Sequence, residues 1–230
     1  MNMRLSKSNF LAGCQCLKRL YLQVHGPELA AKPGAAEEAI IEQGREVGLL
    51  AHQMFPGGVE VRSDGGIDQA IRVTRELVAN PEVPVIFEVA FEHQNVIVRV
   101  DILHRRRDGR WKLIEVKSTT GVEDHHLDDV GIQYRVVRRS GLDIASACLA
   151  HVNRNYVYPG GDIDFCRFFR IKNLTRRILK LQPKLTTQLL SESTVLTMPQ
   201  PPDIAPGHHC VDPDEKSSST RRATTLAHAS

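Results

Sequence analysis

Three charged residues interrupt segments that otherwise have the composition of buried strands. Residues 113–120 read LIEVKSTT, where Glu115 and Lys117 alternate with apolar side chains, and Asp101 lies in the apolar segment VRVDIL. A charge inside a protein is tolerated only when it is paired, hydrogen-bonded or bound to a metal. The pattern therefore points to a polar site built on two strands.

The connection between the two segments, RRRDGR, decides whether their carboxylates meet. If Gly109 takes the left-handed conformation that ends a three-residue loop, the hairpin places Asp101 opposite Glu115, on the same face of the sheet. A two-residue loop would instead place Asp101 opposite Val116 and separate the carboxylates. We favour the longer loop, because opposed carboxylates make chemical sense around a cation.

Two carboxylates held together repel each other unless a proton or a divalent cation lies between them. An oxygen-rich site of this kind suits Mg²⁺ or Mn²⁺ better than zinc. Such a cation can bind a phosphodiester oxygen and activate water, while a nearby lysine such as Lys117 orients the water or neutralises developing charge. The alternative is that Glu115 and Lys117 lie on a solvent-exposed face and Asp101 begins a turn.

The composition of the 230-residue chain is that of an ordinary globular protein. The net charge of +3 permits binding to nucleic acid without requiring it. No apolar segment is long enough to span a bilayer, and the N-terminus lacks the features of a signal peptide. We therefore expect a cytoplasmic protein that does not contact membranes.

The apolar spacing predicts a mixed α/β fold in which three consecutive strands are flanked by helices. Helices are expected at residues 6–24, 37–54, 67–78, 125–139 and 174–190, and strands at residues 85–92, 96–103, 111–118, 145–153 and 165–171. The segment 191–230 is rich in Ser, Thr and Pro, which predicts a disordered tail after a single domain at 1–190.

The succession of VRVDIL, LIEVKSTT and DDVGIQYRVV resembles the RecB-like branch of the PD-(D/E)XK nuclease superfamily. The resemblance implies a restriction-endonuclease-like sheet, with Asp101 and Glu115 as metal ligands and Lys117 as the catalytic lysine. It also implies that Gln133 and Tyr134 lie near the nucleic acid. Four further segments, among them LSKSNFLAGCQCLKRLYL and HVNRNYV, are similar to the N-terminal half of an uncharacterised bacterial family.

RecB-like nucleases usually add a histidine from an early helix to the metal site, and His52 matches it by position. Glu42 and Glu46 are alternatives, because residues four apart share a face of a helix. Glu88, which has apolar neighbours in IFEVAF, is expected either to support the metal site or to form an ion pair with an arginine.

The five cysteines do not make the disulfide framework of a secreted protein. Some RecB-like nucleases of CRISPR adaptation hold an iron–sulfur cluster on four cysteines, and Cys16 and Cys210 match two of them. Cys14 is expected to point away from Cys16 on a helix, and Cys148 and Cys166 to be buried in strands. This incomplete ligand set predicts that no stable four-iron cluster forms.

Three functional hypotheses follow. The first is a Mg²⁺- or Mn²⁺-dependent nuclease acting on DNA single strands or ends, in which basic residues such as Arg135 and Arg138 approach the phosphates. The second is a nuclease-like module that binds nucleic acid without cleaving it. The third is a fragment of a longer nuclease.

Overall fold

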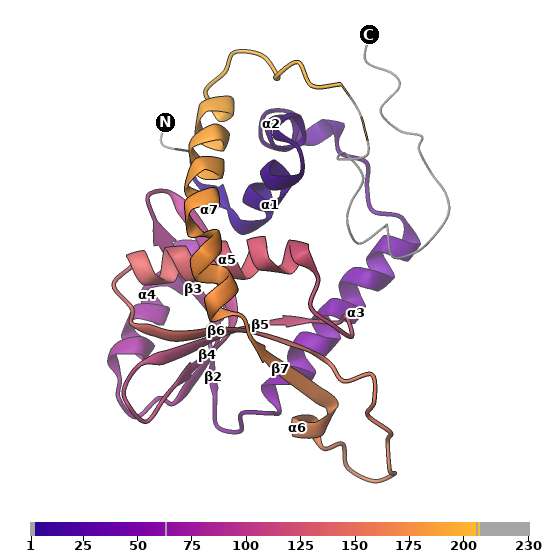
Figure 1. Cartoon of the computed structure of the whole chain (residues 1–230), viewed down its shortest axis with the longest axis vertical. Helices are drawn as coiled ribbons and strands as arrows, with labels where there is room; N and C mark the ends of the chain where they lie inside the picture. Colours follow the sequence, from indigo (N-terminus) through magenta and orange to yellow (C-terminus); the bar gives the residue numbers. More distant parts are fainter. Residues whose placement is uncertain (1–2, 63, 206, 208–230) are drawn as a thin grey trace. The chain divides into compact units, whose positions relative to one another are not determined.

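The computed structural model describes residues 3–62, 64–205 and 207, and they belong to two compact units. The first unit comprises the chain up to Lys7 together with Lys32–Leu185. The second comprises Ser8–Ala31 together with the residues from Thr186 onward. Figure 1 labels their helices and strands. Each unit is described by itself.

The first unit is built on a mixed seven-stranded sheet of order β2-β3-β4-β5-β6-β7, in which β1 also pairs with β4. The strands are β1 (Leu5–Ser6), β2 (Val59–Glu60), β3 (Val85–His93), β4 (Val96–Arg105), β5 (Trp111–Lys117), β6 (Ile144–Val152) and β7 (Phe169–Asn173). The pairs β3-β4, β4-β5 and β6-β7 are antiparallel, and the pairs β1-β4, β2-β3 and β5-β6 are parallel. The predicted mixed central sheet flanked by helices is confirmed.

Two helices cover opposite faces of this sheet (Figure 1). Val47 and Ala51 of α3 (Ala35–His52) pack in a core cluster that includes Ile114 of β5. The next residue of β5, Glu115, meets side chains of α5 (Asp124–Arg139) instead. Since successive residues of a strand point to opposite faces, α3 and α5 lie on the two sides of the sheet.

The remaining helices of the first unit are α4, α6 and the first half of α7. Their bounds are α4 (Gly66–Ala79), α6 (Phe165–Phe168) and α7 (Thr175–Leu196). Within this unit α7 packs closely on α5, because a Cβ atom at Gly131 would overlap the side chain of Leu185. In the described part of the chain, no helix is long and apolar enough to cross a membrane.

The β4–β5 hairpin has the register that a three-residue loop predicts. The loop closes with Arg106 N–H donating to Arg110 at 2.8 Å, and Gly109 takes a left-handed φ of 79°. From there the ladder runs back to Ile102 opposite Ile114. Asp101 and Glu115 therefore occupy the next opposed positions. The short loop that connects β4 and β5 thus sets the register of two carboxylates that lie far from the loop.

Several predicted boundaries were wrong. The helix expected at residues 6–24 is two helices, α1 (Lys7–Gln15) and α2 (Leu17–His25), because the backbone at Cys16 is extended. The strand expected at residues 165–171 begins instead with the short helix α6. The two-residue strands β1 and β2 were not predicted, since two residues are too few to show an alternating pattern.

The second unit contains α1 beyond Lys7, α2, the 3₁₀ helix Pro27–Leu29 and the last turns of α7. Because α7 extends to Leu196, the first residues of the segment 191–230 predicted as a tail are helical. Residues 208–230, on which most of that prediction falls, lie outside the described residues.

Glu192, on the part of α7 that belongs to the second unit, is a fully buried carboxyl group. Gln188 donates to its Oε1 at 2.8 Å, whereas Oε2 is buried and has no hydrogen-bond partner in the part of the chain that the structure describes. Gly13 leaves the space that this carboxyl fills, because a Cβ atom there would overlap it. Burial raises the pKa of Glu192 to about 8, so the group is mostly protonated at neutral pH.

We predict that Glu192→Gln stabilises the protein above pH 5. The folded-state pKa exceeds the ordinary 4.5, so the parent loses stability as the pH rises from 4.5 through about 8, whereas the isosteric amide does not. The expected gain at pH 8 is on the order of a few kcal/mol. Melting temperatures between pH 5 and 9 check this. Glu28→Gln, at an exposed site of the same unit, is the control, and a gain independent of pH would contradict the prediction.

Candidate active site

A pocket of about 620 Å³ opens in the first unit above the centre of the sheet. Its lining brings together α3 and strands β2 to β5. Its charged and polar residues include His52, Glu88, Arg99, Asp101, Glu115 and Lys117. Three residues predicted from the sequence, Asp101, Glu115 and Lys117, thus converge in one pocket, together with His52 and Glu88.

Three carboxylate residues occupy one row across adjacent strands. The pairs Phe87↔Ile102 and Val89↔Val100 place Glu88 of β3 level with Asp101 of β4. The β4–β5 register places Asp101 level with Glu115. At this level the backbone pairing of β4 and β5 has ended, and Val116 N–H donates instead to the side chain of Asp101, at 2.6 Å from Oδ2.

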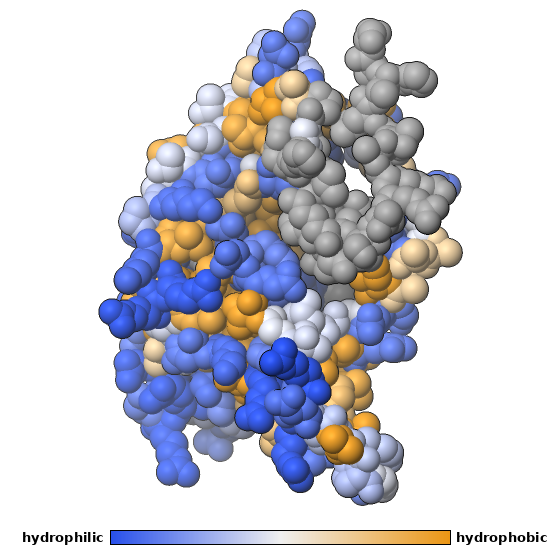
Figure 2. Space-filling view, turned by 45° about the vertical axis from the view of Figure 1, so that its right-hand side comes forward, coloured by the Kyte–Doolittle hydropathy of each residue, from blue (hydrophilic) through white to orange (hydrophobic). Residues whose placement is uncertain are grey.

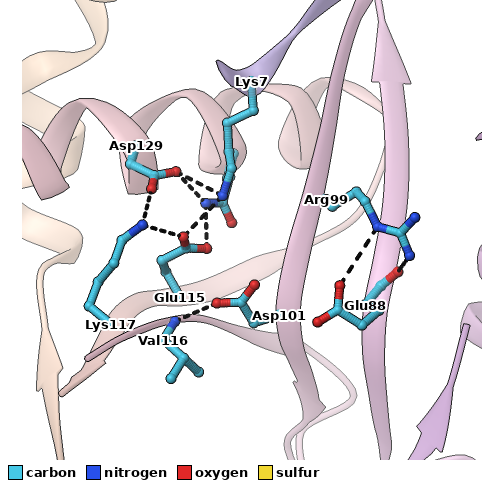
Figure 3. A network of polar contacts seen from close by, with 9 residues as sticks. Lys7, Glu88, Arg99, Asp101, Glu115, Val116, Lys117 and Asp129 are labelled. Carbon is cyan, nitrogen blue, oxygen red and sulfur yellow. Dashed lines mark hydrogen bonds and ion pairs between the residues drawn. The ribbon is translucent and has the colours of Figure 1, made fainter. Parts of the chain in front are cut away.

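Glu115 is the most enclosed of the three, at 2% exposure, and both of its oxygens are hydrogen-bonded. Lys117 Nζ lies 2.9 Å and Lys7 Nζ 3.0 Å from Oε1. Gln133 Nε2 donates to Oε2 at 2.7 Å. The charge that looked out of place in a buried strand is therefore compensated by two ammonium groups and an amide (Figure 3).

Asp129 of α5 completes the network. Its carboxylate lies 2.6 Å from Lys117 Nζ and 3.0 Å from Lys7 Nζ, and Gln133 donates to it at 2.8 Å. Sequence reasoning had selected Gln133 but neither Asp129 nor Lys7. For Asp129 a signal was available, because it precedes Gln133 by four residues and so shares its face of the helix.

The pKa values of the two buried aspartates move in opposite directions. Burial, followed by the charge of Glu115, raises the pKa of Asp101 well above its usual range. Burial acts the same way on Asp129, but the ammonium groups of Lys7 and Lys117 outweigh it and hold the pKa of that carboxyl far below its usual value. For Lys117, burial opposes the charged form, yet Glu115 and Asp129 raise the pKa well above the ordinary one.

Glu88 forms the ion pair with an arginine that was expected as one of two alternatives, while its support of a metal site stays a prediction. It lines the pocket, and its carboxylate lies 3.7 Å from Nε of Arg99, whose Nη2 also donates to the Glu88 carbonyl at 3.1 Å. Burial raises the pKa of Glu88. Its φ of 55° is a left-handed value rare for a non-glycine residue, and strain of this kind concentrates at functional sites.

His52 reaches the pocket from the last turn of α3. Its ring stacks on Phe87 with 3.9 Å between centroids, and its Nε2 is buried without a hydrogen-bond partner among the described residues. Burial lowers the pKa of this histidine, which favours the neutral ring that can bind a cation. The alternatives Glu42 and Glu46 are exposed and do not line the pocket.

The donor atoms of these residues are of the kinds that can bind a hard divalent cation. Asp101 and Glu115 supply oxygens at opposed positions, and His52 offers a buried nitrogen without a partner. Within residues 3–62, 64–205 and 207, however, no three His, Cys, Asp or Glu side chains are arranged to hold a metal ion. At Glu115 both carboxylate oxygens are already engaged by the two lysines and Gln133.

The other predicted residues lie elsewhere. Tyr134 is half-buried and does not line the pocket, and Arg138 is exposed and pairs with Asp143 at 2.6 Å. Cys148 is buried in β6 as expected, whereas Cys166 is exposed, because its segment is helical and not a strand.

Cys16 is buried and Cys14 half-buried. Their expected opposition on one helix was wrong, since α1 ends before Cys16. Cys210 lies outside the described residues.

Comparisons with known proteins add little. No family model matches the sequence, and no curated protein matches it. A solved structure described as "Crystal structure of SSO0001" is similar to this chain with a TM-score of 0.36 and 11% identity, over 81% of this chain and 77% of that one. At this level the likeness supports no conclusion about function.

We predict that Asp101→Asn stabilises the protein. The raised pKa means that the folded state disfavours the carboxylate, so the parent loses stability as the pH rises from about 4 towards the folded-state value. The amide removes that cost and still accepts from Val116 N–H. A gain of about 1 kcal/mol or more at pH 8 is expected in urea unfolding. Asp108→Asn, in the exposed hairpin loop where Arg110 lowers the pKa of the carboxyl, should give no gain.

Asp129→Asn should have the opposite effect. It leaves Lys7 and Lys117 with Glu115 as their remaining ion-pair partner in this network, and breaking a buried ion pair is costly. We expect the free energy of unfolding to fall by about 2 to 3 kcal/mol at pH 7. This loss should shrink towards pH 3, because a carboxyl group whose pKa is lowered in the folded state contributes its full stabilisation only above its unfolded-state pKa. The control is Asp128→Asn, whose carboxylate lies 3.5 Å from Lys184, and similar losses for the two variants would contradict the assignment.

Proposed function

We propose that this protein is a metal-dependent deoxyribonuclease of the RecB-like branch of the PD-(D/E)XK superfamily, hydrolysing DNA phosphodiester bonds on single strands or ends. The observation that supports it best is the convergence of Asp101, Glu115 and Lys117 in one pocket. These residues come from consecutive strands whose register opposes the two carboxylates. A cytoplasmic location, expected from the sequence, fits this activity.

In this proposal each residue has a separate task. Asp101 and Glu115, with His52 as a further candidate ligand, would hold Mg²⁺ or Mn²⁺, which polarises a phosphodiester oxygen and activates water. Lys117 would direct the attacking water or neutralise charge that develops on the phosphate. Gln133, buried on α5, keeps the Glu115 carboxylate oriented through its hydrogen bond to Oε2.

The part of the pocket lining that α3 contributes is suited to a nucleic acid strand. Gly44 and Gly48 of α3 belong to it, and a Cβ atom at either would meet open space. Arg45 and Arg99 line the same pocket and supply positive charge for phosphates. Figure 2 shows one face of the molecule, on which hydrophilic residues lie among hydrophobic patches. The glycines give the room and the arginines the attraction that a phosphodiester backbone needs.

A module that binds nucleic acid without cleaving it is the second candidate. The observation that favours it is the engagement of both Glu115 oxygens by Lys7, Lys117 and Gln133. A site that kept this network permanently would present charge to a phosphate and yet have no Glu115 oxygen free for a metal. Metal-dependent cleavage separates the two candidates.

We predict that the protein cleaves end-labelled DNA with Mn²⁺ and not with a chelator. Lys117→Met and Glu115→Gln should each lower the rate by about 10² or more, because each removes a group that acts on the reacting phosphate or water. Lys112→Met is the matched control, since Lys112 lies on β5 but faces the other side of the sheet and does not line the pocket. Single- and double-stranded substrates tested in parallel resolve strand preference. Cleavage that survives in Glu115→Gln would overturn the proposal.

A further inference from the structure

Lys7 reaches Glu115, one of the residues that line the pocket, because of a strand that the sequence did not reveal. Strand β1 pairs with the beginning of β4, through Leu5↔Val96 and Ser6↔Ile97, while β5 pairs with the end of β4 from Ile102 onward. Since β3 takes the other edge of β4 along its length, β1 and β5 share one edge. Lys7 directly follows β1 and therefore lies between β1 and β5.

The Lys7 ammonium makes nearly the same contacts as the lysine of the E-x-K motif. It lies 3.0 Å from Glu115 Oε1 and 3.0 Å from Asp129 Oδ1, whereas Lys117 Nζ lies 2.9 Å from the same Glu115 oxygen and 2.6 Å from Asp129 Oδ2. Two ammonium groups therefore bridge two carboxylates (Figure 3). The second cation comes from a different part of the chain and a different element.

We infer that Lys7 is a positioning residue that competes with a divalent cation for Glu115 Oε1, an inference that rests on the proposed metal site. A cation that binds this oxygen meets the repulsion of an ammonium group 3.0 Å from it, so Lys7 weakens metal binding until its side chain moves away. Its side chain is 23% exposed, and Asp129 remains as a partner when Glu115 is taken. Lys7 thus sets the metal affinity of the site and keeps Glu115 and Asp129 in place.

The test is Mn²⁺ binding to the full chain at fixed pH, followed by the electron paramagnetic resonance signal of free Mn²⁺. Lys7→Gln should bind Mn²⁺ roughly tenfold more tightly than the parent, because one repelling charge is gone. Lys7→Arg, which keeps the charge, should remain close to the parent. Arg4→Gln is the matched control, since it removes a cation from the same N-terminal segment whose partners, Asp68 and Glu92, do not line the pocket.

A second measurement needs no variant. Reductive methylation of the parent, mapped by mass spectrometry, should label Lys7 faster when Mn²⁺ is added, while exposed Lys32 should not change. Mn²⁺ binding that is equal or weaker in Lys7→Gln, or labelling of Lys7 that does not rise, overturns the inference and leaves the proposed nuclease site intact. If neither parent nor variants bind Mn²⁺, the metal site and the inference both fail.

Discussion

The interaction on which the site depends is the compensation of one carboxylate, that of Glu115, inside the sheet. A buried charge without partners costs several kcal/mol, so each group that meets Glu115 is constrained in turn. Lys117 is placed by the alternation of β5, Gln133 and Asp129 by one face of α5, and Lys7 by the pairing of β1 with β4. Three separate elements of the first unit are thereby fixed around the two carboxylate oxygens of Glu115.

The same constraint links the hairpin loop to the chemistry. The left-handed Gly109 sets a three-residue loop, the loop sets the ladder, and the ladder brings Asp101 level with Glu115. A slip of one residue would move Asp101 to the other face, away from α5. The loop is exposed and makes no contact with the pocket, yet the geometry of the carboxylates depends on it.

Sequence reasoning found the parts of this site that follow from local pattern. Alternation located Asp101, Glu115 and Lys117, and the turn residues supplied the register. It could not find Lys7, because Lys7 owes its place to a two-residue strand and to pairing between residues about ninety positions apart in the chain. It misjudged Cys166 and the break at Cys16 for a related reason, since composition alone does not fix where a short helix begins or ends.

The distribution of charge in the network accounts for part of the difference between the pKa values of Asp101 and Asp129. Lys7 and Lys117 carry two positive charges, and Glu115 and Asp129 carry two negative ones, so these four groups are neutral together. Asp101 makes no ion pair with either lysine, so burial, followed by the charge of Glu115, raises its pKa, whereas the two ammonium groups lower the pKa of Asp129. A divalent cation at this site would favour the ionised form of Asp101 and would displace one ammonium group from Glu115. Of the two lysines, Lys7 is the one not held by the strand that carries Glu115, and it is therefore the one free to leave.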